Sequence, residues 1–221
     1  MNEIVKLMKH FLLIIFLFLL VSCELDKRVI TIEGAVYDPN LEQVVVGVDV
    51  SLYTQSGSGG TFNLSFVKQE TTVSDENGKF LFEHTYDYTS AYKIEFEKEN
   101  YFSNSFEFQS EAIPNDDIYN KDFLLYPQAG IKIHIVNQYP FDENDKIKFR
   151  IIDWQTQCES CCYTSFHEMI GTNINEVLEC NLFGEKEYTV EYLTWKNGNQ
   201  NASHRIVFCP AFETSDVEIS F

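Results

Sequence analysis

TVSDENGKFLF, residues 72–82, decides the fold of this 221-residue chain. Asp, Glu, Asn and Gly occupy residues 75–78, and these residue types are typical of a tight turn. After the turn, Phe80 and Phe82 occupy alternate positions, which is the period of a β-strand with one buried face. The stretch therefore predicts a strand, a turn and a second strand.

The same two-residue period recurs along the chain. Val48, Val50 and Leu52 alternate within residues 47–53, and no segment keeps the 3.6-residue period of a helix. Aromatic residues make up 15% of the chain, mostly Tyr and Phe beside Thr, Val or Ile, which favours strands. We expect an all-β protein, with a Gly/Ser surface loop at residues 56–60. The expected strands of its first half are residues 30–33, 47–53, 63–70, 79–84, 91–97 and 105–108.

Four stretches of the first half resemble the carboxypeptidase regulatory-like, or transthyretin-like, β-sandwich family, over residues 29–127. The resemblance implies that the turn before Phe80 is a hairpin in which Gly78 takes a positive φ. It also implies that Asp75 accepts hydrogen bonds from the backbone of that turn. The four stretches are residues 32–38, 47–50, 72–82 and 92–101.

Two positions depart from the family pattern. Residues 42–45 stand where the family has a Gly between its first two strands, and Asn100 stands where it favours Gly before the final Tyr. Asn tolerates the left-handed region, so the second departure is mild. The resemblance brings no peptidase activity with it, because the zinc-binding His and Glu pair belongs to a catalytic domain that this chain lacks.

A second domain is expected over residues 128–221. Pro114 and Pro127 flank the exit from the first domain, whose last expected strand is residues 123–126. Alternation then resumes, which predicts a second antiparallel β-sandwich, either immunoglobulin-like or a diverged copy of the first. Cys180, Trp195 and Cys209 lie too close in sequence for the usual immunoglobulin spacing. The expected strands are residues 130–136, 146–152, 187–195, 204–208 and 217–221, with a hairpin turn at 196–199.

The N-terminus resembles a bacterial lipoprotein signal peptide. Lys6 and Lys9 precede an apolar run over residues 11–21, which is too short to span a bilayer. The run ends in Leu20-Val21-Ser22-Cys23, which resembles the lipobox of such proteins. We therefore expect residues 1–22 to be a cleaved signal peptide, and a plain secretory signal is the alternative.

The resemblance implies that Cys23 becomes a lipidated mature N-terminus, followed by a tether over residues 23–28. Two or three acyl chains such as palmitate, at about 0.8 kcal/mol per buried methylene, hold a protein stably on a membrane. The membrane is thus the first expected partner. We expect the protein in the cell envelope, anchored to the outer membrane and facing either the periplasm or the exterior.

The charge of the chain excludes one class of partner. The chain has 34 acidic residues against 16 Lys and Arg, and removal of residues 1–22 leaves 33 against 14, a net charge of −19. Nucleic acid requires basic patches, so we expect no nucleic-acid binding.

Five cysteines fall in the second domain, and an exported chain passes through an oxidising compartment, which favours disulfides. One scheme joins Cys180 to Cys209 and closes the Cys158 loop locally, although the sequence alone leaves the connectivity open. The alternative is a metal site of Cys158, Cys161, Cys162 and His167, completed by Cys180 or Cys209. The disulfide candidates are Cys158, Cys161, Cys162, Cys180 and Cys209.

No enzyme or cofactor motif is present, so we expect a non-enzymatic protein without a cofactor. His84 and Asp87 are three residues apart, but a strand would place them on opposite faces. His134 lies between Ile133 and Ile135, which predicts a place on the polar face.

Two further features bear on ligands. The acidic turns at residues 115–117 and 142–145 lack the spacing of an EF-hand loop, and we expect solvated turns. Tyr192 and Trp195 can stack on sugar rings if they are exposed, which leaves a carbohydrate-binding module as one alternative.

The sequence therefore predicts a lipid-anchored envelope protein with a binding or structural role. Outer-membrane transporters and glycan-capture systems are the first partners to consider, because transthyretin-like modules often accompany them. A metal-binding protein and a carbohydrate-binding module are the alternatives.

Overall fold

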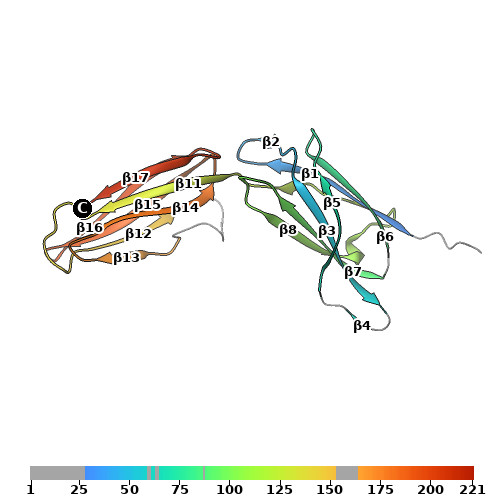
Figure 1. Ribbon diagram of the computed structural model, residues 1–221, viewed down its shortest axis with the longest axis horizontal. Coiled ribbons are helices and arrows are strands. Elements are labelled where there is room, and N and C mark those ends of the chain that lie inside the picture. The colour runs from blue at the N-terminus through green and yellow to red at the C-terminus, as the bar shows by residue number, and fades with distance from the viewer. Residues whose placement is uncertain (1–27, 59–60, 63–64, 87, 153–163) are drawn as a thin grey trace, which may run out of the picture.

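The structure is a computed structural model that describes residues 28–58, 61–62, 65–86, 88–152 and 164–221. Strands dominate these residues, and the one helical element among them is a 3₁₀ turn, η1 (Ser110–Ala112). No helix within these ranges is long and apolar enough to cross a membrane. Figure 1 shows two strand-built lobes arranged end to end along the long axis. The all-β prediction is confirmed.

Each lobe is a β-sandwich around its own hydrophobic core. The first core runs in sequence from Ile30 to Leu125 and the second from Ala129 to Ile219. The alternation predicted the buried faces correctly, because Val48, Val50 and Leu52 are all fully buried.

The first sandwich has two sheets. One sheet is centred on β1, which pairs with β6 on one side and with the short β9 and β10 on the other, while β2 pairs with its end. In the other sheet the order is β5-β3-β7-β8, and β4 pairs with the end of β3. The bounds are β1 (Val29–Asp38), β2 (Gln43–Val44), β3 (Asp49–Ser58), β4 (Thr61–Phe62), β5 (Val67–Val73), β6 (Lys79–Thr85), β7 (Thr89–Glu97), β8 (Asn104–Gln109), β9 (Ile118–Asn120) and β10 (Phe123–Leu124).

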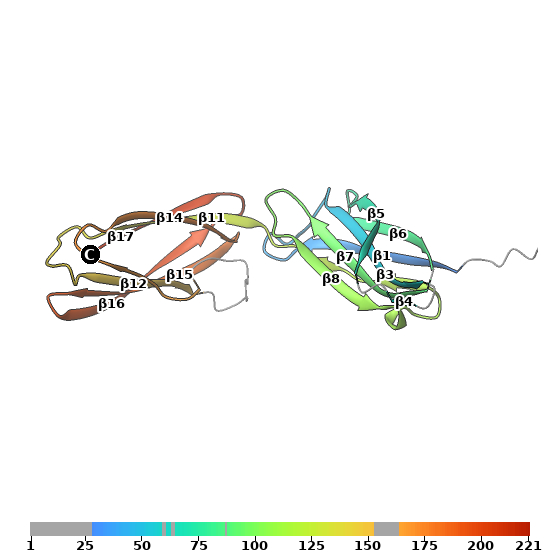
Figure 2. The ribbon, with the colours of Figure 1, turned by 60° about the horizontal axis from the view of Figure 1, so that its bottom comes forward.

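The second sandwich packs a three-stranded sheet, β14-β11-β17, on a four-stranded sheet, β13-β12-β15-β16. Figure 2 shows the strands of both sheets running along the length of the lobe. The bounds are β11 (Gln128–Val136), β12 (Lys146–Ile152), β13 (His167–Ile170), β14 (Asn175–Phe183), β15 (Lys186–Lys196), β16 (Asn199–Cys209) and β17 (Thr214–Ser220).

The second sandwich repeats the strand pairings of the first. β1 pairs antiparallel with β6 and parallel with β9 and β10, and β11 pairs antiparallel with β14 and parallel with β17. In the other sheets β3 and β12 hold the same central position, because β3 pairs with β5 and β7 as β12 pairs with β13 and β15. The short strands β2 and β4 have no counterpart among the described strands of the second sandwich. An immunoglobulin unit pairs its first strand with its second, so the topology is that of a copy of the first sandwich.

The parallel pairs correct the expectation of purely antiparallel sheets. They arise because the last strand of each sandwich crosses back from the opposite sheet and runs beside the first strand in the same direction.

Three turns hold left-handed residues that the sequence helps to explain. Gly78 has φ +71°, and Asp75 Oδ1 accepts the N–H groups of Asn77 and Lys79 at 2.8 Å each, as the family resemblance implied. Asn100 has φ +65° at the second departure from the family pattern. At the first departure Glu42 takes φ +54°, a left-handed conformation that is uncommon for a residue other than Gly.

Candidate functional site

The connection between the two sandwiches is only three residues long, Leu125-Tyr126-Pro127. It is bonded on both sides. Leu125 N–H donates to Tyr37 O at 3.0 Å in the first sandwich, and Gly184 N–H of the second donates to Pro127 O at 2.7 Å. The connection therefore has little freedom to act as a flexible linker.

Aromatic side chains from both sandwiches pack around this connection. The ring of Phe183, at the end of β14, stacks on Tyr126 at 4.6 Å and meets Phe102 edge-on at 5.0 Å. Phe212 of the second sandwich lies 5.4 Å from Tyr101 of the first. Contacts of this kind oppose bending of the two sandwiches against each other.

The turn after β1 adds a direct link between the sandwiches. Asn40 Nδ2 donates to Gly184 O at 2.8 Å, across 144 positions of sequence. Asp38, fully buried at the end of β1, shapes this turn by accepting the N–H groups of Asn40 at 2.9 Å and Leu41 at 3.0 Å. Burial raises the pKa of Asp38, and burial together with the nearby Asp38 carboxylate raises the pKa of Tyr101 to about 12.

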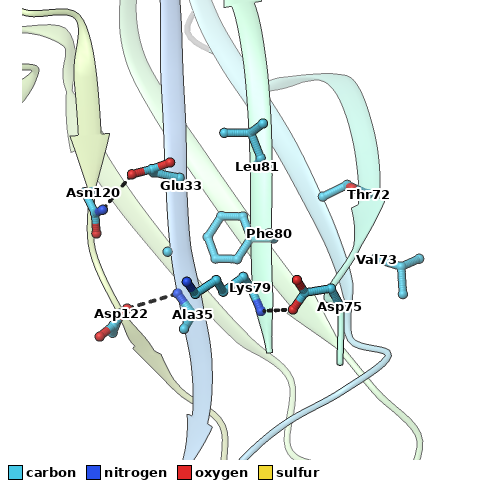
Figure 3. A pocket seen from close by; sticks show the side chains of 11 residues that line it. Glu33, Ala35, Thr72, Val73, Asp75, Lys79, Phe80, Leu81, Asn120 and Asp122 are labelled. Atoms are coloured by element: carbon cyan, nitrogen blue, oxygen red, sulfur yellow. Dashed lines mark hydrogen bonds between the residues drawn. The ribbon is translucent and has the colours of Figure 1, made fainter. Parts of the chain in front are cut away.

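A groove of about 580 Å³ crosses the outer face of the first sandwich, a volume in the range of small-ligand sites. Its floor is formed by β1 and β6, and its walls by the end of β5 with the β5–β6 turn and by the segment from β9 to β10. Figure 3 shows the polar side chains converging from these separate segments. The lining residues are Glu33, Gly34, Ala35, Thr72, Val73, Asp75, Lys79, Phe80, Leu81, Asn120 and Asp122.

Gly34 explains how the wall comes so close to the floor. A Cβ at Gly34 would lie 1.8 Å from Lys121 O, so the neighbouring chain can cross here only over a glycine. Asp122 Oδ1 accepts Ala35 N–H at 3.0 Å, and Asn120 Nδ2 donates to Glu33 Oε1 at 2.7 Å (Figure 3).

The groove is acidic, with one cation. Hydrogen bonds from the backbone N–H groups of Lys79 and Asn77 lower the pKa of Asp75, so this carboxylate is charged at neutral pH. In Figure 3 the Lys79 side chain extends over Ala35 toward Asp122. Such a lining suits hydroxyl or amine groups and repels phosphate. No group of three or more metal-ligating side chains occurs among the described residues.

The sequence analysis did not find this groove. Asp75 and Gly78 were identified, but as turn residues. The other polar groups come together through bonds from β1 to a segment 87 positions away, Ala35 N–H to Asp122 and Asn120 to Glu33. Nothing in the period of either strand indicates that contact.

The predicted lipid anchor lies outside the described residues. This applies to the signal peptide 1–22, to Cys23 and to the tether up to residue 27, so the anchor stays a prediction.

The disulfide between Cys180 and Cys209 that the sequence suggested is not formed. Cys209 is a free thiol, fully buried in the second core, and its pKa is raised by burial. Cys180 is disulfide-bonded, so these two are not joined to each other. Cys180 lies on β14 and Cys209 on β16, which belong to different sheets. The strand of the Cys180 sheet that contacts β16 is β17, and β11 lies between β17 and β14. Cys158, Cys161 and Cys162 lie outside the described residues.

His167 lies on β13 (His167–Ile170). It is exposed, with its ring 5.4 Å from that of Phe149. Cys158, Cys161 and Cys162 of the proposed metal site fall in residues 153–163, outside the described ranges, so the metal alternative stays a prediction.

The candidates for sugar stacking are less accessible than expected. Tyr192 is only 8% exposed and belongs to the second core, so it offers no surface for stacking. Trp195 is half-buried, with Lys146 Nζ 4.3 Å from the ring centroid. Burial of Tyr192 follows from its position on the inward face of β15, between Val190 and Thr194.

His134 and His84 have local partners. His134 lies on the outward face of β11, as predicted, and its Nε2 is 2.9 Å from Asn175 Oδ1. His84 meets Tyr92 edge-on at 6.0 Å, and Asp87 lies outside the described residues.

One of the two acidic turns differs from the prediction. Asp117 is partly exposed and accepts Arg28 Nε at 2.7 Å. Asp145 is fully buried, not solvated. Its Oδ2 accepts Phe141 N–H at 2.7 Å and Asn137 Nδ2 at 2.9 Å, so it organises a loop.

No protein-family model matches the chain, and no curated protein matches it either. Among solved structures, the Bacillus anthracis TIE protein has a TM-score of 0.38 at 12% identity, over 87% of this chain and 34% of that one, so this chain spans about a third of it. The shaft pilin SpaA from Lactobacillus rhamnosus GG has a TM-score of 0.34 at 10% identity, over 88% of this chain and 97% of that one. 3-Chlorocatechol 1,2-dioxygenase from Rhodococcus opacus has a TM-score of 0.32 at 12% identity, over 45% of this chain and 60% of that one. At TM-scores this low, the similarities indicate nothing about what this chain binds or does.

Proposed function

We propose that the protein is a lipid-anchored spacer of the bacterial cell envelope, in which the first sandwich holds the second at a fixed distance from the membrane. The observation that carries the proposal is the three-residue junction, bonded to both sandwiches and surrounded by aromatic rings. A flexible tether would need none of these contacts.

The positions of the chain ends support this role. β1 begins at the outer end of the first sandwich, and the C-terminus lies at the outer end of the second (Figures 1 and 2). An anchor at Cys23 therefore places the second sandwich far from the lipid. The net charge of −19 on the mature chain keeps the body off anionic headgroups.

The anchor is tested first, with the full-length chain and Cys23→Ser expressed in a Gram-negative host. We expect the wild type in the outer-membrane fraction, released only by detergent, and the variant in the soluble fraction. A wild-type chain that is soluble without detergent would contradict anchoring. Protease treatment of intact cells then distinguishes surface exposure from a periplasmic orientation.

A binding role accessory to a transport or glycan-capture system is the second candidate, and the groove on the first sandwich favours it. A pull-down in mild detergent compares the wild type with Cys23→Ser and with Ala35→Trp, which fills the groove floor. A partner lost only with Ala35→Trp binds at the groove, whereas a partner lost only with Cys23→Ser requires the membrane. A partner kept by both variants requires neither.

A further inference from the structure

β16 differs from every other long edge strand in the described part of the chain. It has 11 residues and contains no carboxylate, although the chain has 34 acidic residues. Charged side chains on an edge strand are a common means of preventing pairing with another chain. The other described edge strands longer than three residues all carry at least one carboxylate. These are Glu70 on β5, Glu83 on β6, Glu107 on β8, Glu168 on β13, Glu176 and Glu179 on β14, and Asp216 and Glu218 on β17.

The side chains of β16 are also uncovered. Residues 199–206 are all exposed, and Ile206 and Phe208 are 64% and 47% exposed. Only His204 and Arg205 can carry charge on this strand. A long, exposed edge strand presents unpaired N–H and C=O groups with which a strand of another chain can pair.

The topological counterpart of β16 in the first sandwich has its aromatic side chains covered. This is β8, where Phe108 is 6% exposed and stacks on Tyr119 at 4.0 Å. Lys121 Nζ lies 3.6 Å from the ring centroid of Phe106 on the same strand. The openness of β16 is therefore specific to the second sandwich and not a property of the shared topology.

The register with β15 shows which backbone groups are free. Lys196 and Asn199 flank a two-residue turn in which Asn197 and Gly198 have φ +47° and +71°, so they form a hydrogen-bonded pair. Hydrogen-bonded pairs alternate along an antiparallel ladder. The even-numbered residues from 200 to 208 thus direct N–H and C=O away from β15. Phe208 O is occupied by Ser215 Oγ at 2.9 Å, which leaves residues 200–206 open.

We propose that β16 pairs antiparallel with β16 of a second copy of this chain, with Ser203 on the two-fold axis. In this register Ala202 faces His204 of the second copy, and Asn201 faces Arg205. No like charges stand opposite each other, which an antiparallel pair requires. Because the strand lacks carboxylates, this is the long edge where two strongly acidic molecules can approach within a Debye length, about 8–10 Å.

The pairing also fixes the orientation of the two molecules. β15 leaves the junction and β16 returns toward it, so β16 lies along the long axis of the molecule (Figure 2). An antiparallel pair then lays the second sandwiches side by side, with the first sandwiches pointing in opposite directions. The two β1 strands then begin at opposite ends of the pair, so this pairing applies to chains that are not both held upright on the same membrane surface (Figures 1 and 2).

The test measures the mass of the purified chain from residue 24 onward by light scattering and sedimentation over a concentration series. We expect a monomer–dimer equilibrium in the wild type. Both Ser203→Glu and Ser203→Lys place like charges across the two-fold axis, and each raises the dimer dissociation constant about tenfold or more. The matched controls are Ser105→Glu and Ser105→Lys, on the exposed face of the counterpart strand β8, which leave the equilibrium unchanged.

Ser203→Glu and Ser203→Lys introduce opposite charges, so together they distinguish a second copy of the chain from an acidic partner segment at this edge. A wild-type chain that is monomeric at every concentration overturns the proposal, as does a dimer that persists in both Ser203 variants. An acidic partner segment would instead be weakened by Ser203→Glu and strengthened by Ser203→Lys. Oxidation of Ser203→Cys gives an independent check, since only a register with this residue on the axis yields a covalent dimer, and Ser105→Cys is its control.

Discussion

Asp145 is a buried carboxylate that joins two loops at the outer end of the second sandwich. It accepts hydrogen bonds from Phe141 and Asn137, while its own backbone C=O accepts Gly171 N–H at 2.8 Å. Burial alone would raise the pKa of Asp145, but the hydrogen bonds from Asn137 and Phe141 outweigh it and the pKa is lowered. The sequence shows only an acidic turn, because the partners that bury this side chain are supplied by the fold.

We expect Asp145→Ala to destabilise the second sandwich by about 2 kcal/mol, because it leaves buried N–H donors without an acceptor. Denaturant unfolding followed by tryptophan fluorescence measures this, since Trp154 and Trp195 both belong to the second half of the chain. Asn144→Ala, at the exposed neighbouring position, is the control and has little effect. Equal stability of the two variants would contradict the assigned role.

Asp75 predicts a pH dependence for the first sandwich. Its pKa is lowered by the backbone N–H groups of Lys79 and Asn77, so its stabilising effect is present above the unfolded-state pKa of about 3.9. The effect is lost as the pH falls through the lower folded-state value. We expect Asp75→Asn to lower the melting temperature at about pH 7 and to match the wild type near pH 2. A difference that stays constant over this range would contradict the assignment.

The strands that could be predicted from the sequence are those whose side chains are alternately buried and exposed. β3, β6 and β7 bury alternate residues, and their period of two was visible in the sequence. β13 and β14 were missed because they are edge strands with mostly exposed residues, so little hydrophobic alternation marks them. The expected loop at residues 56–60 begins inside β3, where Ser56 pairs with Thr89 across a register shift.

Two glycines with the same φ of +71° predict different costs of substitution. A Cβ at Gly78 would lie 2.8 Å from Val36 O, whereas a Cβ at Gly198 would meet nothing within 4 Å. Gly198→Ala therefore has only the backbone cost of about 1 kcal/mol. Gly78→Ala adds a steric clash at the β5–β6 turn and costs more. Calorimetric unfolding of both variants checks this order, and the reverse order would contradict it.

At the scale of the whole molecule, two sandwiches of one topology are joined without a flexible linker. The sequence predicted a boundary near Pro127, but it did not indicate that the junction is packed. Its contacts join Asn40 to Gly184 and Tyr101 to Phe212, pairs that are distant in sequence and on loops without periodicity. Pattern analysis detects the faces of strands, and these contacts lie beyond strand ends.

Phe183→Ala removes two aromatic contacts at the junction and predicts a looser molecule. Small-angle scattering should show a broader distribution of end-to-end dimensions than in the wild type, while circular dichroism shows both sandwiches folded. Phe141→Ala is the control, because this phenylalanine is 59% exposed and far from the junction in sequence. An unchanged scattering curve for Phe183→Ala would contradict a junction stiffened by its aromatic rings.

The parallel pairing of the first and last strands has a mechanical consequence. A pull between the N-terminus and the second sandwich acts on the start of β1 and the end of β10, which run side by side in the same direction. Such a load slides the strands along each other, so the hydrogen bonds of the ladder resist together and do not break one after another. β11 and β17 repeat the arrangement under a pull on the C-terminus. Tension along the length of the molecule thus loads both pairs of strands in shear.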